Sequence, residues 1–405
     1  MTESVRSLTE LIQRAGAQRF LEAPPPEDLG LADNLAFPFL ALVGQQEMKL
    51  ALLLTIINPN VGGVLLLGPR GTGKTTAVRS LVDLLPEVQR SRCQYGCLPE
   101  DIETGGIDAV CPDCARKYAE GESLTYPDRV RLIELPLNAR MEDVVGGLDE
   151  RAAVHHRLRL NRGLLARADR NLLYVDEANL LGDEIVDAIL DAAAQGIYTV
   201  HRGALAATFR ARFALIGSMN PEEGGLRPQI LDRFGLRVLV HGLVDPLDRL
   251  EAYRRSLAFR SSPRQLIAHY IEETLLAGEE LLQARQILPT VKLSDEAERF
   301  GLRLVRELSI DSLRAEITMF EAARAYASAD GRAEATPEDV RVVAPMALRL
   351  RRSRFIRDYF RTQEKEEAEL RRLLSHQAGK PASARRAPNA KRAGHRADPL
   401  QGRRR

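Results

Sequence analysis

The chain has 405 residues, of which 44% are hydrophobic and 28% charged, and its formal net charge is +2. These proportions are typical of a globular protein of two or three domains and exclude a disordered chain, and only four cysteines exclude a disulfide scaffold. Because no apolar run reaches the roughly 18 residues of a membrane span and no secretory segment opens the chain, we expect a cytoplasmic protein without a membrane span.

Residues 1–36 are predicted to form an N-terminal extension or linker, because Pro24-Pro25-Pro26 interrupts any helix. A helix is predicted next, over residues 47–57. The segment Val43-Gly44-Gln45 comes just before it. Such a segment ahead of a phosphate-binding loop often lies against the nucleotide base, but it is also typical of an ordinary helix start.

The strongest motif is a phosphate-binding loop, Gly68-Pro69-Arg70-Gly71-Thr72-Gly73-Lys74-Thr75. Its glycines let backbone N–H groups approach phosphate oxygens closely, Lys74 places a charge on the β- and γ-phosphates, and Thr75 offers a hydroxyl to Mg²⁺. A buried strand is predicted before the loop over residues 64–67, and a helix after it over residues 76–85. This context favours nucleotide binding over a surface glycine-rich turn. The predicted nucleotide contacts are Gly68, Pro69, Arg70, Gly71, Thr72, Gly73, Lys74, Thr75, Thr76 and Asp176.

All four cysteines fall in a predicted insert over residues 90–127. Cys93 and Cys97 form one close pair, and Cys111 and Cys114 form a second. Two close pairs with this spacing are typical of a structural zinc site, in which four thiolates surround one tetrahedral ion. A redox-active dithiol and four independent free thiols are the alternatives.

A second strong motif is an apolar run, residues 172–175, that ends in the acids Asp176 and Glu177. Asp176 is predicted to hold Mg²⁺ together with Thr75, directly or through water. Glu177 is predicted to orient and deprotonate the water that attacks the γ-phosphate. A plain strand end with two acids is the alternative.

Three further polar residues are candidates for the same reaction. Asn220 follows a predicted strand over residues 213–218, where its amide could sense the γ-phosphate or simply begin a turn before Pro221. Arg233 ends a predicted helix and is either an arginine finger for a neighbouring subunit or a surface arginine paired with an acid. Arg314 lies near the start of another helix and is a candidate to contact the γ-phosphate from the lid.

The rest of the chain is predicted to be helical. Residues 246–375 are expected to form a helical lid domain, with helix starts at Ser294 and Thr336 and a charged helix over residues 349–372. Residues 376–405 are basic and are expected to be a disordered tail. This tail either contacts an acidic partner, nucleic acid or a membrane surface, or only aids solubility.

The order of these motifs resembles that of the AAA+ ATPases. Two segments are similar in sequence to the ATPase subunit I family of magnesium chelatase. They are Tyr174-Val175-Asp176-Glu177-Ala178-Asn179-Leu180-Leu181 and Met219-Asn220-Pro221-Glu222-Glu223-Gly224. The segment from Arg227 to Leu236 and the cysteine-bearing insert match that family as well. The resemblance covers about residues 37–350.

The resemblance implies an α/β core with a parallel sheet over residues 37–245 and an all-α lid. It also implies a hexameric ring whose ATP hydrolysis drives insertion of Mg²⁺ into protoporphyrin IX in (bacterio)chlorophyll biosynthesis. The partners would be an integrin-like subunit and a porphyrin-binding subunit. In that family Lys74, Thr75, Asp176, Glu177, Asn220, Arg233 and Arg314 match nucleotide-site positions.

Two other functions stay open on the sequence alone. One is a chaperone-like ATPase that remodels complexes with a different integrin-like partner. The other is a nucleic-acid motor, suggested by the basic tail but not favoured, because the tail contains no aromatic residue for base stacking.

Overall fold

The computed structural model describes residues 35–93, 95–147, 160–202, 205–224, 228–351, 365–369 and 372. The chain divides into two compact units, Met1–Arg352 and Ser353–Arg405, and residues 365–369 of the second are helical. Nearly all of the predicted N-terminal extension and the whole basic tail lie outside the described residues. Within the described ranges, no helix is long and apolar enough to cross a bilayer.

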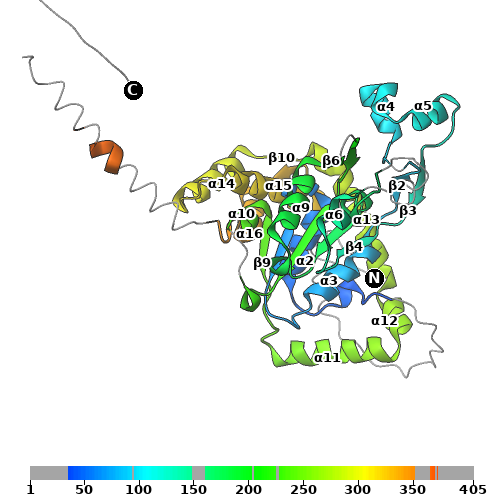
Figure 1. Cartoon of the computed structure of the whole chain (residues 1–405). Coiled ribbons are helices and arrows are strands. Elements are labelled where there is room, and N and C mark those ends of the chain that lie inside the picture. The colour runs from blue at the N-terminus through cyan, green and yellow to red at the C-terminus, as the bar shows by residue number, and fades with distance from the viewer. Residues whose placement is uncertain are drawn as a thin grey trace, which may run out of the picture. The chain divides into compact units, whose positions relative to one another are not determined.

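A five-stranded parallel sheet is the centre of the first unit (Figure 1). In order across the sheet, its strands are β4 (Leu132–Leu135), β5 (Leu172–Val175), β8 (Ala214–Met219), β1 (Val64–Leu67) and β9 (Leu236–Leu239). Strands β1, β5 and β8 are buried along their whole length, as expected where helices cover both faces of a parallel sheet. The predicted strands at residues 64–67, 172–175 and 213–218 and the α/β fold class are therefore confirmed.

Among the described residues, the remaining strands form three small pairs, namely β2 (Val88–Ser91) with β3 (Thr125–Asp128), β6 (Ile197–Arg202) with β7 (Leu205–Arg210), and β10 (Lys292–Leu293) with β11 (Glu334–Ala335). The helices around the sheet are α2 (Gln46–Ile57), α3 (Lys74–Ser80), α6 (Met141–Val145), α8 (Leu164–Arg167), α9 (Asp183–Gln195) and α10 (Pro228–Arg233). The cysteine-bearing insert contains α4 (Pro99–Gly105) and α5 (Pro112–Ala119). The lid helices are α11 (Pro246–Ser261), α12 (Pro263–His269), α13 (Ile271–Ile287), α14 (Asp295–Glu307), α15 (Leu313–Ala329) and α16 (Pro337–Leu348).

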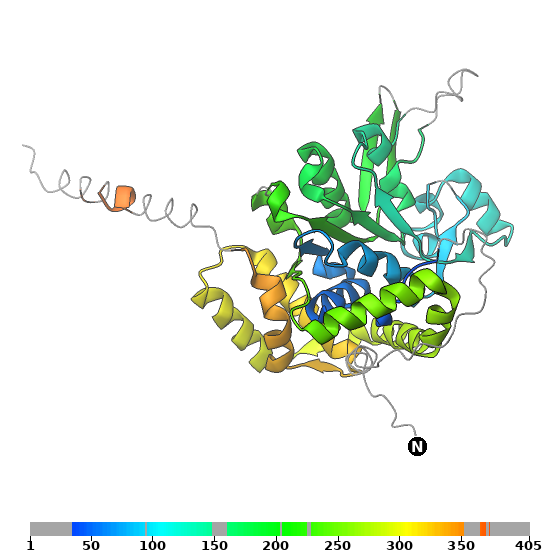
Figure 2. The ribbon, with the colours of Figure 1, turned by 90° about the horizontal axis from the view of Figure 1, so that it is seen from below.

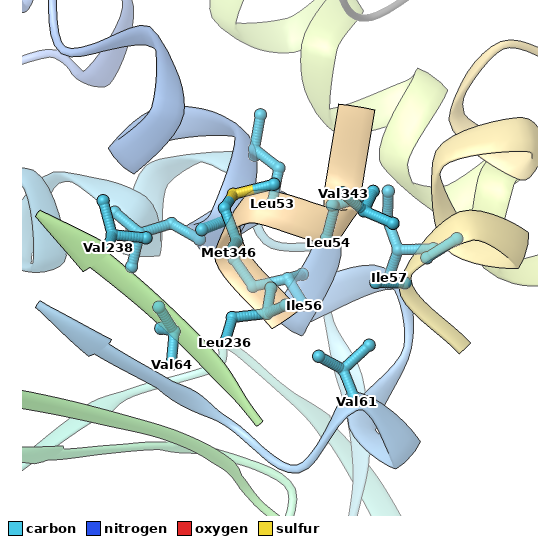
Figure 3. Close-up of a cluster of buried hydrophobic side chains, with 14 of the residues drawn as sticks. Leu53, Leu54, Ile56, Ile57, Val61, Val64, Leu236, Val238, Val343 and Met346 are labelled. Atoms are coloured by element: carbon cyan, nitrogen blue, oxygen red, sulfur yellow. The ribbon is translucent and has the colours of Figure 1, made fainter. Parts of the chain in front are cut away.

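Helix α2 joins the sheet to the lid helices. Leu53, Leu54, Ile56 and Ile57 are at most 1% exposed, because they pack between β1 and β9 on one side and α16 on the other (Figure 3). In the view from below, α2 lies at the centre in blue with the lid helices beside it in yellow and orange (Figure 2). A helix with apolar residues on every side is expected to be buried all round. One hydrophobic core therefore runs from the sheet into the lid helices.

The predicted helix starts in the lid are confirmed by their capping contacts. The Ser294 hydroxyl accepts a hydrogen bond from the Ala297 N–H at 3.2 Å. Thr336 and Asp339 form a capping box at the start of α16. The predicted charged helix is wrong at its beginning: α16 ends at Leu348, and Leu350 has φ +59°, which a helix does not contain.

Candidate functional site

The phosphate-binding loop connects the buried strand β1 to helix α3. Gly71 and Gly73 have φ of +78° and +86°, a region that residues with a side chain rarely adopt. A Cβ atom on Gly68 would lie 2.1 Å from the Val240 carbonyl oxygen, so this position has no room for one. The helix after the loop is shorter than predicted, since α3 ends at Ser80 and a 3₁₀ turn continues over Leu81–Leu84.

The Lys74 ammonium group is held inside the loop. Its Nζ atom donates hydrogen bonds to the carbonyl oxygens of Gly68 at 2.6 Å and Pro69 at 2.8 Å. Burial lowers the pKa of Lys74, and the carboxylates of Asp176 and Glu177 act in the opposite direction. The side chain is thus a positive charge with little contact to water, which strengthens its attraction for a phosphate.

Thr75 and Asp176 meet where the loop helix passes the end of β5. The Thr75 hydroxyl lies 3.5 Å from Asp176 Oδ2 and 3.2 Å from the Tyr174 hydroxyl. A hydroxyl and a carboxylate oxygen that face one cavity are the hard oxygen ligands that Mg²⁺ prefers. These two residues therefore fit a nucleotide-bound Mg²⁺.

Glu177 and Asn220 face the same cavity from the ends of β5 and β8. The Glu177 carboxylate pairs with Arg70 at 3.0 Å, and Arg70 pairs with Glu223 at 2.7 Å. Asn220 is 4% exposed, and its side-chain oxygen accepts a hydrogen bond from the Glu222 N–H. An acid and an amide at neighbouring strand ends can orient and deprotonate a water molecule.

Two adjoining cavities have room for a nucleotide. The first, of about 400 Å³, is lined by Arg70, Gly71, Thr72, Gly73, Lys74, Thr75, Thr76, Asp176, Glu177, Ser218, Met219 and Asn220. The second, of about 430 Å³, shares Gly71, Thr72, Gly73 and Thr76 with it. Val43 and Gln45 line this second cavity beside the apolar side chains of Phe37, Leu42 and Met48, a lining that suits a planar base.

Arg233 and Arg314 lie elsewhere. Both line a separate cavity of about 550 Å³ with residues 59–62, which precede β1, and with no residue of the phosphate-binding loop. Arg233 ends α10, which precedes β9, and the Gly235 N–H donates to the Gly62 carbonyl oxygen. The loop follows β1, so the four residues of this strand separate the two sites by about 13 Å or more.

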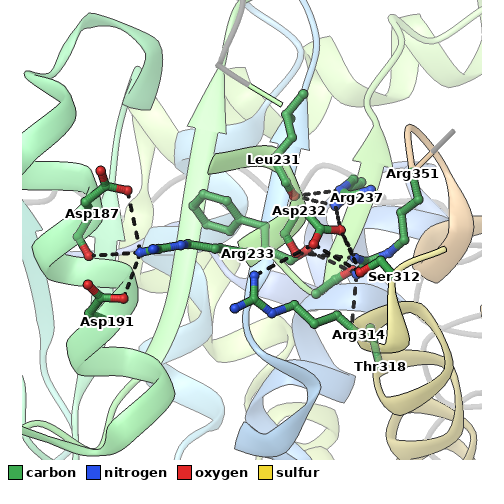
Figure 4. Close-up of polar contacts among 12 residues, drawn as sticks. Asp187, Asp191, Leu231, Asp232, Arg233, Arg237, Ser312, Arg314, Thr318 and Arg351 are labelled. Atoms are coloured by element: carbon green, nitrogen blue, oxygen red, sulfur yellow. Dashed lines mark hydrogen bonds and ion pairs between the residues drawn. The ribbon is translucent and has the colours of Figure 1, made fainter. Parts of the chain in front are cut away.

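The two arginines have different partners, as Figure 4 shows. Arg233 points to α9, where its Nη1 atom lies 2.8 Å from the Asp191 carboxylate and 3.5 Å from that of Asp187. Arg314 turns toward the Asp232 carboxylate at 3.7 Å and is 56% exposed. Neither arginine reaches the loop of its own chain, so the structure does not bring Arg314 to the chain's own phosphate site.

Asp232 is the centre of an ion-pair network between α10 and the lid helices. Its carboxylate accepts hydrogen bonds from Arg351 at 2.6 Å and from the Ser312 hydroxyl at 3.1 Å. Arg237, whose side chain is fully buried, lies 3.7 Å away. The pKa of Arg237 is lowered to about 9, mainly by burial and also by the charge of Arg351, while Asp232 opposes the shift. Sequence analysis missed this network, because only the fold brings residues 232, 312 and 351 together.

The four cysteine sulfur atoms lie within 4.8 Å of one another. The Cys93 and Cys111 sulfurs are 3.5 Å apart, and no disulfide joins any of the four. Backbone N–H groups point at two of the sulfurs, from Tyr95 to Cys93 at 3.3 Å and from Cys111 to Cys97 at 3.4 Å. Four thiolates at about 2.3 Å from one tetrahedral ion lie about 3.8 Å apart, so the cluster is close to this geometry.

Comparison with known proteins agrees with the fold. A family described as AAA domain matches residues 60–221, and one described as AAA lid domain matches residues 303–373. A "Magnesium-chelatase subunit ChlI homolog" of Methanocaldococcus jannaschii is 42% identical over 79% of this chain and 87% of its own length. The "Magnesium-chelatase 38 kDa subunit" of Acidiphilium rubrum is 43% identical over 78% of this chain and 90% of its own. A chain from a solved complex between subunits BchI and BchD of magnesium chelatase is 37% identical, covers 80% of this chain and 99% of its own, and has a TM-score of 0.45.

The Asp232 network yields a prediction about stability. Asp232→Ala should lower the free energy of unfolding by about 3 kcal/mol, because it leaves Arg237 and Arg351 buried without a counter-charge. The control is Asp187→Ala, which removes a half-exposed partner of Arg233. It should change the free energy of unfolding by about 0.5 kcal/mol or less. Urea unfolding of the two variants measures the difference. Equal stability of the two variants would contradict the role given to Asp232.

Proposed function

This chain belongs to the magnesium-chelatase subunit I family of AAA+ ATPases, and we propose on that basis that its ATP hydrolysis drives the insertion of Mg²⁺ into protoporphyrin IX in (bacterio)chlorophyll biosynthesis. The single observation that supports an ATPase most strongly is the common cavity of Lys74, Thr75, Asp176, Glu177 and Asn220. The family relatives favour a chelatase over a remodeller of other complexes.

The proposed mechanism is in-line attack of water on the γ-phosphate. A bound Mg²⁺ would supply positive charge that offsets the negative charge of the phosphates. Thr75 Oγ1 and Asp176 Oδ2 would hold this ion, directly or through water, and Lys74 Nζ turns from the loop carbonyls to the phosphates. Glu177 takes the proton of the attacking water once its carboxylate leaves Arg70, and the Asn220 amide orients that water.

We assign Arg233 and Arg314 to the nucleotide of a neighbouring subunit. Their cavity lies beside the start of β1, whereas the phosphate-binding loop follows its end, so a ring with head-to-tail contacts is needed to bring them to ATP. The ion pairs of Arg233 with Asp187 and Asp191 are partly exposed, and pairs of this kind contribute about 0–1 kcal/mol each. Arg233 can therefore exchange these partners for a phosphate at small cost.

The proposed partners follow from the family. We propose a hexameric ring in the cytoplasm that acts with an integrin-like subunit and a porphyrin-binding subunit. On this proposal the porphyrin binds to the porphyrin-binding subunit, and this chain supplies the free energy of ATP hydrolysis.

We further propose that Cys93, Cys97, Cys111 and Cys114 hold a structural Zn²⁺. The support is their mutual distances of at most 4.8 Å and the small size of the core around them, which buries Val110 and Leu124 together with Cys97 and Cys114. So small a core is insufficient to fix two short helices, and a metal ion is a common way to stabilise such a segment.

Reconstitution tests the chelatase function. The chain, mixed with integrin-like and porphyrin-binding chelatase subunits, ATP and Mg²⁺, should convert protoporphyrin IX to its magnesium complex, measured by fluorescence. Glu177→Gln should stop both insertion and phosphate release, because the attacking water loses its base. Wild-type chain that hydrolyses ATP but supports no insertion with its partners would reject the chelatase function and leave the ATPase standing.

Mixed rings test the trans position of Arg233. Arg233→Ala alone should lower the ATPase rate by about 10³-fold or more, because the transition-state charge loses its arginine. Adding Lys74→Ala subunits, which are inactive but keep Arg233, should restore activity at roughly a quarter of the interfaces of a randomly mixed ring. Arg303→Ala, an exposed arginine of α14, serves as the control and should leave the rate unchanged. Absence of rescue at every mixing ratio would show that Arg233 does not act across subunits.

Metal analysis tests the zinc site. Purified protein should contain about one zinc per chain, and Cys97→Ser together with Cys114→Ser should remove it. A chelator strong enough to remove the zinc should unfold residues 90–127, seen as faster proteolysis within this segment. Protein without zinc whose four thiols all react freely in the folded state would disprove the site.

A further inference from the structure

The Asp176 carboxylate is surrounded by hydroxyl groups that the ATPase motifs do not include. Alternation along β5 places Tyr174 and Asp176 on the same face of the sheet. The register of β5 with β8 pairs Tyr174 with Ile216, so Ser218, two residues further along, lies opposite Asp176. Two strands thus bring a phenol and an aliphatic hydroxyl to one carboxylate.

The two oxygens of this carboxylate have unequal surroundings. Oδ1 accepts three hydrogen bonds, from the Tyr174 hydroxyl at 2.9 Å, from the Glu177 N–H at 3.1 Å and from the Ser218 hydroxyl at short range. Oδ2 has one hydrogen-bond contact among the described residues, the Thr75 hydroxyl at 3.5 Å. Oδ1 is therefore fixed by the protein, and Oδ2 is left facing the cavity.

We propose that Tyr174 and Ser218 are positioning residues that hold Asp176 so that Oδ2 alone is offered to the Mg²⁺ of the bound nucleotide. This inference rests on the proposed ATPase function. A carboxylate that rotates freely must be ordered when the ion binds, whereas one with Oδ1 already anchored is ordered in advance. Partners that orient a metal ligand in this way typically contribute 10- to 100-fold to metal affinity or activity.

Both hydroxyls also connect Asp176 to other parts of the site. Tyr174 lies 3.2 Å from the Thr75 hydroxyl, and so contacts both proposed Mg²⁺ ligands. The Ser218 hydroxyl accepts a hydrogen bond from the Glu177 N–H at 3.2 Å. The Ser218 hydroxyl thus contacts both the carboxylate of the proposed metal ligand and the backbone of the proposed base.

Equilibrium binding of a fluorescent ATP analogue, with Mg²⁺ and with a chelator, tests the proposal. In wild-type protein Mg²⁺ should strengthen binding, and in Tyr174→Phe this gain should fall by about tenfold while binding without Mg²⁺ stays unchanged. The Mg²⁺ concentration that half-saturates ATP hydrolysis should rise by a similar factor. Ser218→Ala should act in the same direction, which provides a second measurement if one variant folds poorly.

Tyr270→Phe is the matched control, because Tyr270 is also fully buried and its hydroxyl has no hydrogen-bond partner among the described residues. It should behave as wild type. Unchanged Mg²⁺ dependence in both Tyr174→Phe and Ser218→Ala would overturn the proposal. Equal weakening of binding with and without Mg²⁺ would also overturn it, since that result indicates a general structural role. Failure of wild-type protein to hydrolyse ATP would instead reject the proposed function itself.

Discussion

The direction of the parallel sheet determines how this protein can use ATP. All the strand ends that carry polar site residues point to one edge, because β1, β5 and β8 are parallel. Helix α10 precedes β9 and so lies at the opposite edge, together with Arg233. Because the length of β1 separates Arg233 from the phosphate-binding loop, rotation of the arginine side chain cannot bring it to the loop of its own chain. On the proposed function, each subunit therefore binds its own nucleotide but depends on a neighbour to hydrolyse it.

The hydrophobic core explains how events at the two edges are linked. Helix α2 packs against the sheet and against α13, α15 and α16, so sheet and lid helices share one core. Close-packed cores deform little and transmit displacement between the elements that form them. The second cavity, beside the loop, is lined partly by α11 of the lid. A nucleotide that contacts both the loop and α11 is thus connected through α2 to the far edge, where Arg233 and Arg314 lie.

Much of this arrangement could be predicted from the sequence, because its strongest signals are local. The loop, the acids after β5 and the amide after β8 all follow apolar runs, and the ends of parallel strands meet at one edge. The cysteine pairs were recognisable by spacing alone. The position of Arg314 was not, since a helix start carries no information about the edge of the sheet on which it packs. Tyr174 was overlooked because a tyrosine within an apolar run is expected to be core, and its hydroxyl contacts depend on the register with β8.

Adjacent residues of α10 show how a fixed helix can carry a movable side chain. Asp232 faces Arg351 and Arg237, whose side chains are fully buried, and removal of one member of such a group leaves a charge in the core. Arg233 faces the partly exposed Asp187 and Asp191, where water compensates for a broken ion pair. The strong contacts of Asp232 therefore hold the helix to α15 and to the chain after α16, while the weak contacts of Arg233 allow its guanidinium to change partners. On the proposed function, Arg233 binds the nucleotide of another subunit only during part of each cycle, which requires both properties, and two adjacent residues of one helix supply them.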